Sequence, residues 1–271
     1  MNFGLIVIGD EILSGKRADK HLPKVVELLA QRGLALSWAR LVGDDPERIR
    51  ADLRDAFASG DVVFSCGGIG ATPDDHTRQC AAAALGVPLA LHPQARDLVI
   101  ERMRDQAREQ GRPYEPDRDD NRHRLNMAVF PEGAEIIPNP YNKIAGFAVR
   151  TGADRRGGVF FVPGFPVMAW PMIEWVLDEH YRDLRRDTGT RERSVIVFGA
   201  MEAALTPLME EIEAAFAGIK VFSLPSVDHP QWGRHIELGV KGDAEALAAA
   251  FAKMRAGLEA QGAKLGPELV R

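Results

Sequence analysis

Apolar residues in the first two thirds of the chain fall into short continuous runs, separated by stretches with a helical period. The runs are rich in β-branched and aromatic residues, which is typical of strands buried on both faces. We predict such strands at residues 3–8, 34–42, 62–64, 135–137 and 159–162. Because these strands alternate with helices, the pattern indicates an α/β fold with a mostly parallel sheet.

Each of the intervening helical stretches has one apolar side. The residues expected to face the sheet are Leu22, Val25, Val26 and Leu29 in the first helix, Ile49, Leu53 and Phe57 in the second, and Leu98, Met103 and Ala107 in a charged helix over 94–110. The stretch from Gly111 to Arg124 is dense in Arg, Asp and Pro and is expected to be a solvated loop. The alternative is that it lies across a functional site or a subunit contact.

The pattern changes after a polar stretch at 181–192, which is predicted to be a linker. Beyond it we predict a strand at 193–199, a helix at 202–217, strands at 219–224 and 234–241, and a helix at 243–261. In the strand at 234–241, alternate positions are apolar, which predicts one apolar face. The chain is therefore divided into an α/β domain at 1–180 and a small α+β domain at 191–271.

Composition narrows the class of protein. The 271 residues carry a formal net charge of −5, whereas a general nucleic-acid binder is usually basic. No apolar run approaches the roughly 18 residues of a membrane-spanning helix, and the chain enters a strand without a basic leader. The two cysteines form neither a disulfide framework nor a metal motif and are expected to be buried. We expect a cytoplasmic protein that binds neither membranes nor nucleic acid.

The strongest candidate site follows the strand at 62–64. Gly67, Gly68 and Gly70 allow the backbone to turn sharply and to approach a ligand closely. The residues after them offer oxygen atoms, namely Thr72, Asp74, Asp75 and Thr77. Loop N–H groups and a helix start attract phosphate, and the acidic pair indicates Mg²⁺ or another hard divalent cation between carboxylate and phosphate. The alternative is a tight turn that binds nothing.

Acidic residues also follow two other predicted strands. Gly9, Asp10 and Glu11 end the first strand, and Asp44 ends the second. The neighbouring Asp45 is explained as a helix N-cap before a proline, so Asp44 is the better ligand candidate. Ligands of open α/β sheets bind at the carboxyl ends of strands, and we therefore expect Asp10, Asp44 and Asp75 to converge there.

These segments resemble those of the CinA (competence/damage-inducible protein A) amino-terminal family, part of the wider MoaB/Mog molybdopterin-binding group. Residues 67–77 resemble the family's GGLGPTxDDxT, residues 8–15 its IGDELLxG, residues 42–45 its VGDN and residues 162–166 its LPGVP. The resemblance implies a three-layer MoaB/Mog-like domain followed by a small KH-like domain. It also implies that Asn139, Gly164 and Pro166 help to bind the ligand. No segment resembles the carboxy-terminal deamidase domain of full-length CinA proteins.

The chain departs from the family pattern in three places. His21 stands where relatives tend to carry Asn, and Met168 where they usually carry Glu. Asn142 and Lys143 replace a Gly-Thr pair in a segment that resembles NPxGTAPGF. All of these segments are expected to line the pocket, so the substrate is left open.

The resemblance implies two activities, Mg²⁺-dependent hydrolysis of ADP-ribose and adenylylation of molybdopterin. We expect hydrolysis, with Asp75, Asp44 and Asp10 as catalytic residues and metal ligands. The alternative is a non-catalytic molybdopterin- or nucleotide-binding protein linked to molybdenum cofactor biosynthesis. A third possibility is an assembly role for the second domain. The second domain lacks a recognisable RNA-clamping GXXG loop, so RNA binding is not expected. The protein is expected to form a homo-oligomer, either a dimer or a trimer.

Overall fold

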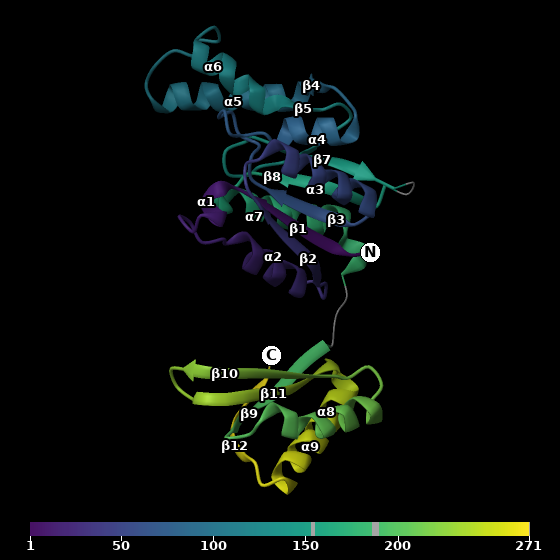
Figure 1. The fold of residues 1–271 in the computed structure, drawn as a ribbon. Coiled ribbons are helices and arrows are strands. Elements are labelled where there is room, and N and C mark those ends of the chain that lie inside the picture. The colour runs from purple at the N-terminus through teal and green to yellow at the C-terminus, as the bar shows by residue number, and fades with distance from the viewer. Residues whose placement is uncertain (153–154, 186–189, 271) are drawn as a thin grey trace. The chain divides into compact units, whose positions relative to one another are not determined.

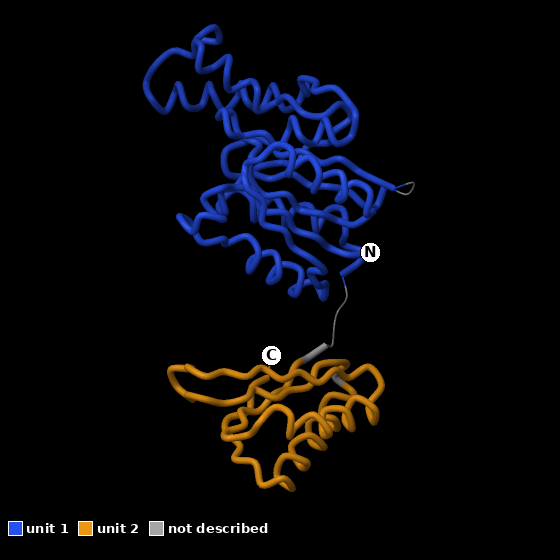
Figure 2. Tube along the Cα trace, viewed as in Figure 1, with its two compact units in different colours: residues 1–185 blue, residues 186–271 orange. Residues whose placement is uncertain are grey.

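The computed structural model describes residues 1–152, 155–185 and 190–270, and it divides into two compact units at 1–185 and 186–271 (Figure 2). Tyr181, the first residue of the predicted linker, belongs to unit 1, because its ring is only 2% exposed and packs edge-on against Phe3 and Phe160. Residues 186–189 of that linker lie outside the described residues. Each unit has its own hydrophobic core.

Unit 1 is built around a six-stranded sheet with the order β2-β1-β3-β8-β7-β6. The four strands β2, β1, β3 and β8 are parallel, and β7 and β6 are antiparallel to their neighbours. The mostly parallel sheet is therefore confirmed. In chain order the strands are β1 (Phe3–Ile8), β2 (Leu36–Val42), β3 (Val62–Cys66), β6 (Glu135–Ile137), β7 (Gly146–Thr151) and β8 (Gly157–Val162).

Helices cover both faces of this sheet, as Figure 1 shows. Leu5 and Val7 of β1 belong to one core, and Ile6 and Ile8 belong to the other, because successive side chains of a strand point to opposite faces. The first core lies under α2 (His21–Ala30) and α7 (Pro166–His180); the second lies under α3 (Pro46–Ser59), α4 (Thr77–Leu85) and α5 (Pro93–Glu109). The predicted three-layer α/β architecture is confirmed.

The predicted apolar face of α2 is wrong at one position. Val26 is 46% exposed, whereas Leu28 is fully buried. The helix buries His21, Val25, Leu28 and Leu29, which follow one another at helical spacing. His21 therefore takes a core position that an apolar pattern does not reveal. Cys66 and Cys80 are both buried, as expected.

The segment between α4 and β6 forms an additional layer above α4 (Figure 1). A two-stranded antiparallel sheet pairs β4 (Leu89–Leu91) with β5 (Val129–Pro131). Between these strands lie α5, α6 (Asp119–Arg124) and the 3₁₀ helix η1 (Leu125–Ala128). The predicted loop at 111–124 is thus wrong over its last six residues. α6 buries only Asn121, so it has no apolar period by which it could be predicted.

Unit 2 is the small α+β domain, with one antiparallel sheet in the order β10-β11-β9-β12 and a core shared with two helices. In chain order its elements are β9 (Thr190–Phe198), α8 (Glu202–Ala215), β10 (Lys220–His229), β11 (Gly233–Asp243), α9 (Ala244–Ala260) and β12 (Lys264–Val270). β12 was not predicted, and β10 is longer than predicted. β11 is buried on both faces from His235 to Val240, and Glu237 accepts a hydrogen bond from the Ser194 hydroxyl at 2.7 Å.

Among the described residues of both units, no helix is long and apolar enough to cross a membrane.

Candidate functional site

A cavity of about 570 Å³ opens at the carboxyl ends of the parallel strands of unit 1. It is reached by residues that follow β1, β2, β3 and β8, namely Gly9, Asp44, Gly67 and Gly164. Ten of the residues predicted for the site line it: Gly9, Glu11, Asp44, Gly67, Gly68, Gly70, Thr72, Asp74, Asp75 and Gly164. The parallel sheet therefore brings together segments that are more than 150 residues apart in the chain.

The glycine loop after β3 needs glycine for its conformation. Gly67 and Gly68 have φ angles of 110° and 68°, which side-chain-bearing residues rarely adopt. A Cβ atom at Gly68 would collide with the Thr77 hydroxyl. Thr77 is fully buried, its hydroxyl donates to the Gly67 carbonyl at 3.0 Å, and its N–H donates to the Gly68 carbonyl at 3.0 Å. Thr77 thus shapes the loop and does not line the cavity.

Asp75 is held in place by the loop that precedes it. Its Oδ2 atom accepts hydrogen bonds from the Thr72 N–H at 2.8 Å and from the Thr72 hydroxyl at 2.5 Å. A Cβ atom at Gly70 would meet the same carboxylate, so glycine at this position makes room for Asp75. The carboxylate is half-buried at the cavity with its orientation set in advance.

Asp10 and Asp44 bridge the ends of β1 and β2. The Asp10 N–H donates to Asp44 Oδ2 at 2.9 Å, and the Asp44 N–H donates to Asp10 Oδ1 at 3.0 Å. Asp10 is exposed at the start of α1 (Asp10–Leu13) and does not line the cavity. Burial raises the pKa of Asp44, and the carboxylates of Asp10, Glu11 and Asp74 raise it further, against the lowering effect of the Asp10 N–H.

The expectation that Asp10, Asp44 and Asp75 together form a metal centre is not met by their geometry. Within residues 1–152, 155–185 and 190–270, no three His, Cys, Asp or Glu side chains are placed to hold one metal ion. One carboxylate oxygen of Asp10 accepts a hydrogen bond from the Asp44 N–H, and one of Asp75 accepts a hydrogen bond from the Thr72 N–H. Only Asp44 and Asp75 of the three face the cavity.

Two other predicted residues support the cavity walls without lining them. Asn139 is 4% exposed, and its Nδ2 donates to Asn142 Oδ1 at 2.8 Å and to the Ile144 carbonyl at 2.9 Å. It therefore shapes the loop that carries Asn142 and Ile144 to the cavity. Pro166 occupies the first position of α7, where its missing N–H costs no helical hydrogen bond.

The positions that depart from the family pattern lie at or next to the cavity. Asn142 and Met168 both line it, and Asn142 Nδ2 lies 3.2 Å from Met168 Sδ. His21 is buried behind Gly164, whose carbonyl lies 3.0 Å from His21 Nε2. Lys143 adopts a φ of 67°, which is unusual for a residue with a side chain.

Sequence reasoning missed most of the apolar wall and all of the cationic groups. The apolar lining residues are Ile8, Ile69, Val99, Met103, Met127, Ile144, Phe165 and Met168, and the basic ones are Arg17, Arg102 and Arg124. Met103 lay in a predicted apolar stripe. Arg124 ends the charge-dense stretch at 111–124, which was expected to be a solvated loop or, alternatively, to lie across a functional site. Its place in the cavity wall supports the alternative.

Arg78 was also missed, although it contacts the glycine loop directly. It is only 5% exposed, and its Nη2 donates to the Gly70 carbonyl at 2.6 Å. Its Nη1 donates to the Asn126 carbonyl, which precedes the cavity-lining Met127. Burial lowers the pKa of Arg78, and the Asp75 carboxylate opposes this effect. A single arginine in a helix gives no sequence signal for such a role.

Comparison with known proteins identifies the family. A family model described as a probable molybdopterin binding domain matches residues 4–183. The chain belongs to this family. The CinA amino-terminal, MoaB/Mog-like membership that the motifs indicated is thereby confirmed.

Individual relatives agree with this membership. A CinA-like protein from Anaeromyxobacter dehalogenans (strain 2CP-C) is 35% identical over 225 residues, which cover 81% of this chain and 51% of that protein. Another from Anaeromyxobacter sp. (strain K) is 38% identical over 178 residues, covering 65% and 40% respectively. The chain thus spans about half the length of these relatives. A CinA structure of unknown function from Thermoplasma acidophilum shares the fold, with a TM-score of 0.55, 24% identity and coverage of 66% of this chain and 98% of that one.

Proposed function

We propose that unit 1 binds a phosphorylated pterin or nucleotide, with a molybdopterin-type molecule as the leading candidate. The observation that carries this proposal is a single cavity with a glycine loop at one wall and apolar side chains at another. Ile144, Phe165 and Met168 offer apolar surface to a flat heterocycle. The family description, a probable molybdopterin binding domain, favours the pterin over other heterocycles.

The phosphate would bind at the glycine loop. Consecutive backbone N–H groups in such a loop form an anion site, and the N-terminus of the following helix adds a partial positive charge. The first N–H of α4 donates to the Gly68 carbonyl, and among the described residues no side chain caps this end of the helix. Arg78 adds a buried cation behind Gly70.

A divalent cation such as Mg²⁺ fits this wall. Glu11, Asp44, Asp74 and Asp75 line the cavity, and the pKa of Asp44 is raised by burial and, to a smaller extent, by the carboxylates of Asp10, Glu11 and Asp74. Mg²⁺ usually takes one or two carboxylates together with phosphate oxygens and water. Asp44 and Asp75 would hold it. When bound, the ion supplies the positive charge that allows an anionic phosphate to lie beside carboxylates.

Binding is tested by calorimetric titration with two probes, AMP and a pterin with a terminal phosphate. Met168→Trp places a large ring on the apolar wall and should abolish binding of both probes. Val167→Trp is the matched control, because Val167, the residue next to Met168, is 53% exposed and does not line the cavity. Saturable binding to wild type that is lost only in Met168→Trp supports the proposal. If wild type binds neither probe, the proposal is wrong.

A second candidate function is hydrolysis of a phosphoanhydride such as ADP-ribose. It is favoured by the geometry of the cavity, because a glycine loop that could hold a phosphate and the carboxylates of Asp44 and Asp75 line the same cavity. Water would add across the P–O–P bond and release AMP and ribose 5-phosphate. We expect product formation only with Mg²⁺, and its loss in Asp44→Asn and Asp75→Asn. Chromatography measures the products. If ADP-ribose is unchanged after long incubation, hydrolysis is excluded and only the binding function remains.

A further inference from the structure

The wall of the cavity formed by α5 and α6 is basic, unlike the acidic wall at the strand ends. Arg102 and Gln106 lie one turn apart on α5 and both line the cavity, as does Arg124 at the end of α6. Arg124 Nη1 donates to Gln106 Oε1 at 2.9 Å, which brings its guanidinium group to the face of α5 that carries Arg102. Two arginines therefore stand side by side at one wall.

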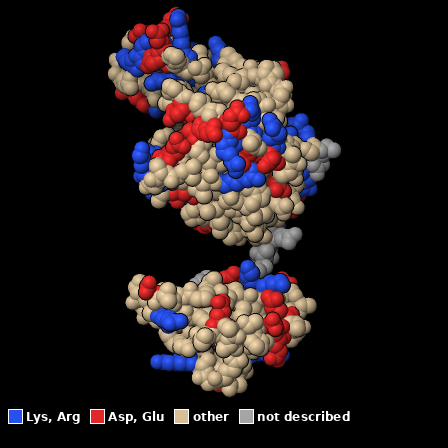
Figure 3. Space-filling view, in the orientation of Figure 1, with Lys and Arg blue, Asp and Glu red and all other residues tan. Residues whose placement is uncertain are grey.

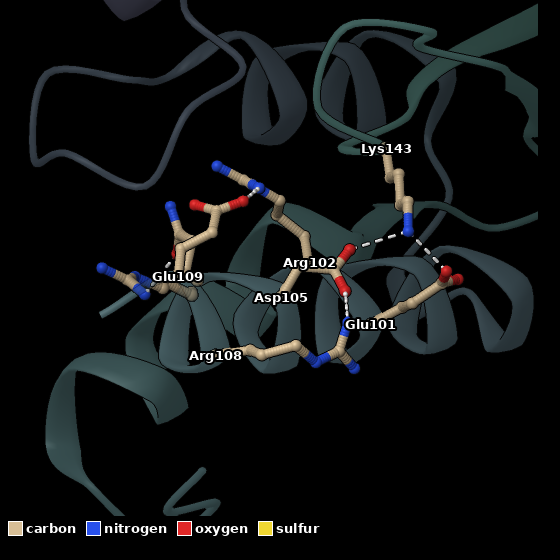
Figure 4. Close-up of polar contacts among 8 residues, drawn as sticks. Glu101, Arg102, Asp105, Arg108, Glu109 and Lys143 are labelled. Atoms are coloured by element: carbon tan, nitrogen blue, oxygen red, sulfur yellow. Dashed lines mark hydrogen bonds and ion pairs between the residues drawn. The ribbon is translucent and has the colours of Figure 1, made fainter. Parts of the chain in front are cut away.

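The first arginine, Arg102, is only partly neutralised by the protein. Its Nη1 donates to Glu109 Oε1 at 2.9 Å, as Figure 4 shows. Within the described parts of the chain, neither its Nε nor its Nη2 has a hydrogen-bond partner. Since a guanidinium group carries five N–H donors, several remain for a ligand. The side chain is 26% exposed, which suits a group that meets ligand at a cavity wall.

The second arginine, Arg124, is compensated even less. The carboxylate nearest to it, Asp120, lies 3.8 Å from its Nη2. Asp120 is already engaged by both Nε and Nη2 of Arg118, and this contact lowers the pKa of Asp120. Arg124 is thus left with a neutral partner, Gln106, and one carboxylate that it shares with Arg118. Elsewhere on α5 and α6, acidic and basic side chains are intermixed at the surface (Figure 3).

We propose that Arg102 and Arg124, positioned by Gln106, form a second anion subsite, so that the ligand carries two anionic groups at separate positions. This inference rests on the proposed binding function of the same cavity. One group, a phosphate, binds at the glycine loop near the carboxylates and takes a cation with it. The other, a phosphate or carboxylate, binds the two guanidinium groups directly, because planar N–H donors match such oxygen pairs.

The proposal is tested with two probes that differ by one remote phosphate, AMP and adenosine 3′,5′-bisphosphate, titrated calorimetrically into the full chain with Mg²⁺. Wild type should bind the bisphosphate at least about tenfold more tightly, as expected for charge-assisted hydrogen bonds. The double variant Arg102→Gln/Arg124→Gln should reduce this ratio to about one and leave AMP affinity within about twofold. Raising the salt concentration should lower the wild-type ratio, since the contacts are partly exposed.

The matched control is Arg96→Gln/Arg122→Gln, which removes one arginine from α5 and one from α6. Both are exposed and neither lines the cavity, so the ratio should stay at the wild-type value. Equal wild-type affinity for the two probes would overturn the subsite while leaving the binding function standing. Equal weakening of both probes in the first double variant would also overturn it. Binding of neither probe by wild type would remove both proposals.

Discussion

At the scale of single residues, the cavity depends on groups whose geometry is set by short contacts to the backbone. Asp75 is the clearest case, because its Oδ2 accepts both hydrogen bonds from Thr72, whereas its Oδ1 accepts none from the described residues. In Asp75→Asn the amide oxygen can accept the same two hydrogen bonds, so the loop should keep its conformation. Only the charge is removed.

We therefore expect Asp75→Asn to abolish the effect of Mg²⁺ on AMP binding. Wild type should bind AMP about tenfold more tightly with Mg²⁺, and the variant should show no gain, because a carboxamide is a poor Mg²⁺ ligand. Without Mg²⁺ the variant should bind at least as well as wild type, since a negative charge near phosphate is gone. Titration with and without Mg²⁺ measures this, with exposed Asp97→Asn as control. An unchanged Mg²⁺ effect would exclude Asp75 as a ligand.

Arg78→Leu tests the support of the glycine loop from behind. The change leaves the Gly70 and Asn126 carbonyls without their donor in a buried place, and we expect a loss of about 2–3 kcal/mol in the free energy of unfolding. AMP affinity should fall as well. Urea unfolding measures the first effect and titration the second. Arg96→Leu on the exposed side of α5 should change neither, and a stable, fully binding Arg78→Leu would contradict the role.

At the scale of elements, α5 and the loop from Asn139 to Ala145 form two walls of the cavity that a small ionic cluster joins. Lys143 Nζ lies 2.5 Å from Glu101 Oε1 and 2.7 Å from Asp105 Oδ2, one turn apart on α5 (Figure 4). Lys143 also holds a φ of 67°. We call this group of Lys143, Glu101 and Asp105 the clasp. A single exposed ion pair contributes little to stability, but two ion pairs made by the same ammonium group can restrain a loop.

Lys143→Gly separates the clasp from the backbone conformation, because glycine adopts a positive φ without strain. If the clasp restrains the loop, the amides of residues 141–145 should exchange hydrogen about tenfold faster in the variant, an order of magnitude typical of losing weak pairs. Hydrogen exchange with mass spectrometry measures this. Lys24→Gly is unsuitable as a control within a helix, so Lys264→Gly at the start of β12 serves. Equal exchange in wild type and Lys143→Gly would show that the backbone alone holds the loop.

The clasp should be independent of pH over most of the accessible range. Lys143 lowers the pKa of Asp105 below its ordinary 3.8, and the carboxylates of Asp105 and Glu101 raise the pKa of Lys143 above 10.5. The contribution of the Asp105 carboxylate is therefore present above pH 3.8 and lost as the pH falls through its lowered pKa. The ammonium contribution is lost only above pH 10.5. Loop protection should thus be constant from about pH 5 to 9 once exchange rates are corrected for pH.

Phe147 of β7 joins the additional layer to the main sheet. Its ring is fully buried between Phe130 of β5 and Phe161 of β8, with centroid distances of 4.8 and 4.3 Å and nearly parallel planes. Phe147→Ala should lower the free energy of unfolding by about 3–5 kcal/mol, and Phe147→Leu by less than half as much. Chemical unfolding measures both. A loss below about 1 kcal/mol in the alanine variant would mean that the layer repacks without this ring.

At the scale of the whole molecule, each unit has a core of its own. Two clusters fill the faces of the sheet in unit 1, and a third fills unit 2 around Leu238, Ile212 and Phe251. We expect chains of residues 1–185 and 186–271 to fold separately, with cooperative thermal unfolding for each, and the first to bind AMP as the full chain does. Circular dichroism and titration check this. An unfolded 1–185 chain would show that its core is insufficient. The homo-oligomer, a dimer or a trimer, stays a prediction for sedimentation analysis.

Much of unit 1 could be predicted because its signals are local. Runs of β-branched residues bounded by glycine turns mark buried strands, and the motif at 67–77 marks the loop. Errors occurred where burial depends on distant partners. α6 has no apolar period, and Leu28 rather than Val26 faces the core because His21 fills the first inward position of α2. β12 carries Gly266 and Pro267, which obscure its strand pattern.

The sequence by itself determined the α/β class, the family, the glycine loop and the acidic strand ends, because each is encoded in a few adjacent residues. Only the tertiary structure decided which of these residues face the cavity. Thr77 and Asn139 support loops of the cavity through hydrogen bonds and do not line it. Asp10 lies outside the cavity, whereas Arg102 and Arg124 line its wall. The physical reason is that lining a cavity is a property of converging elements. The contacts that orient a side chain, such as the hydrogen bond that Arg124 donates to Gln106, join helices whose relative placement no local pattern records.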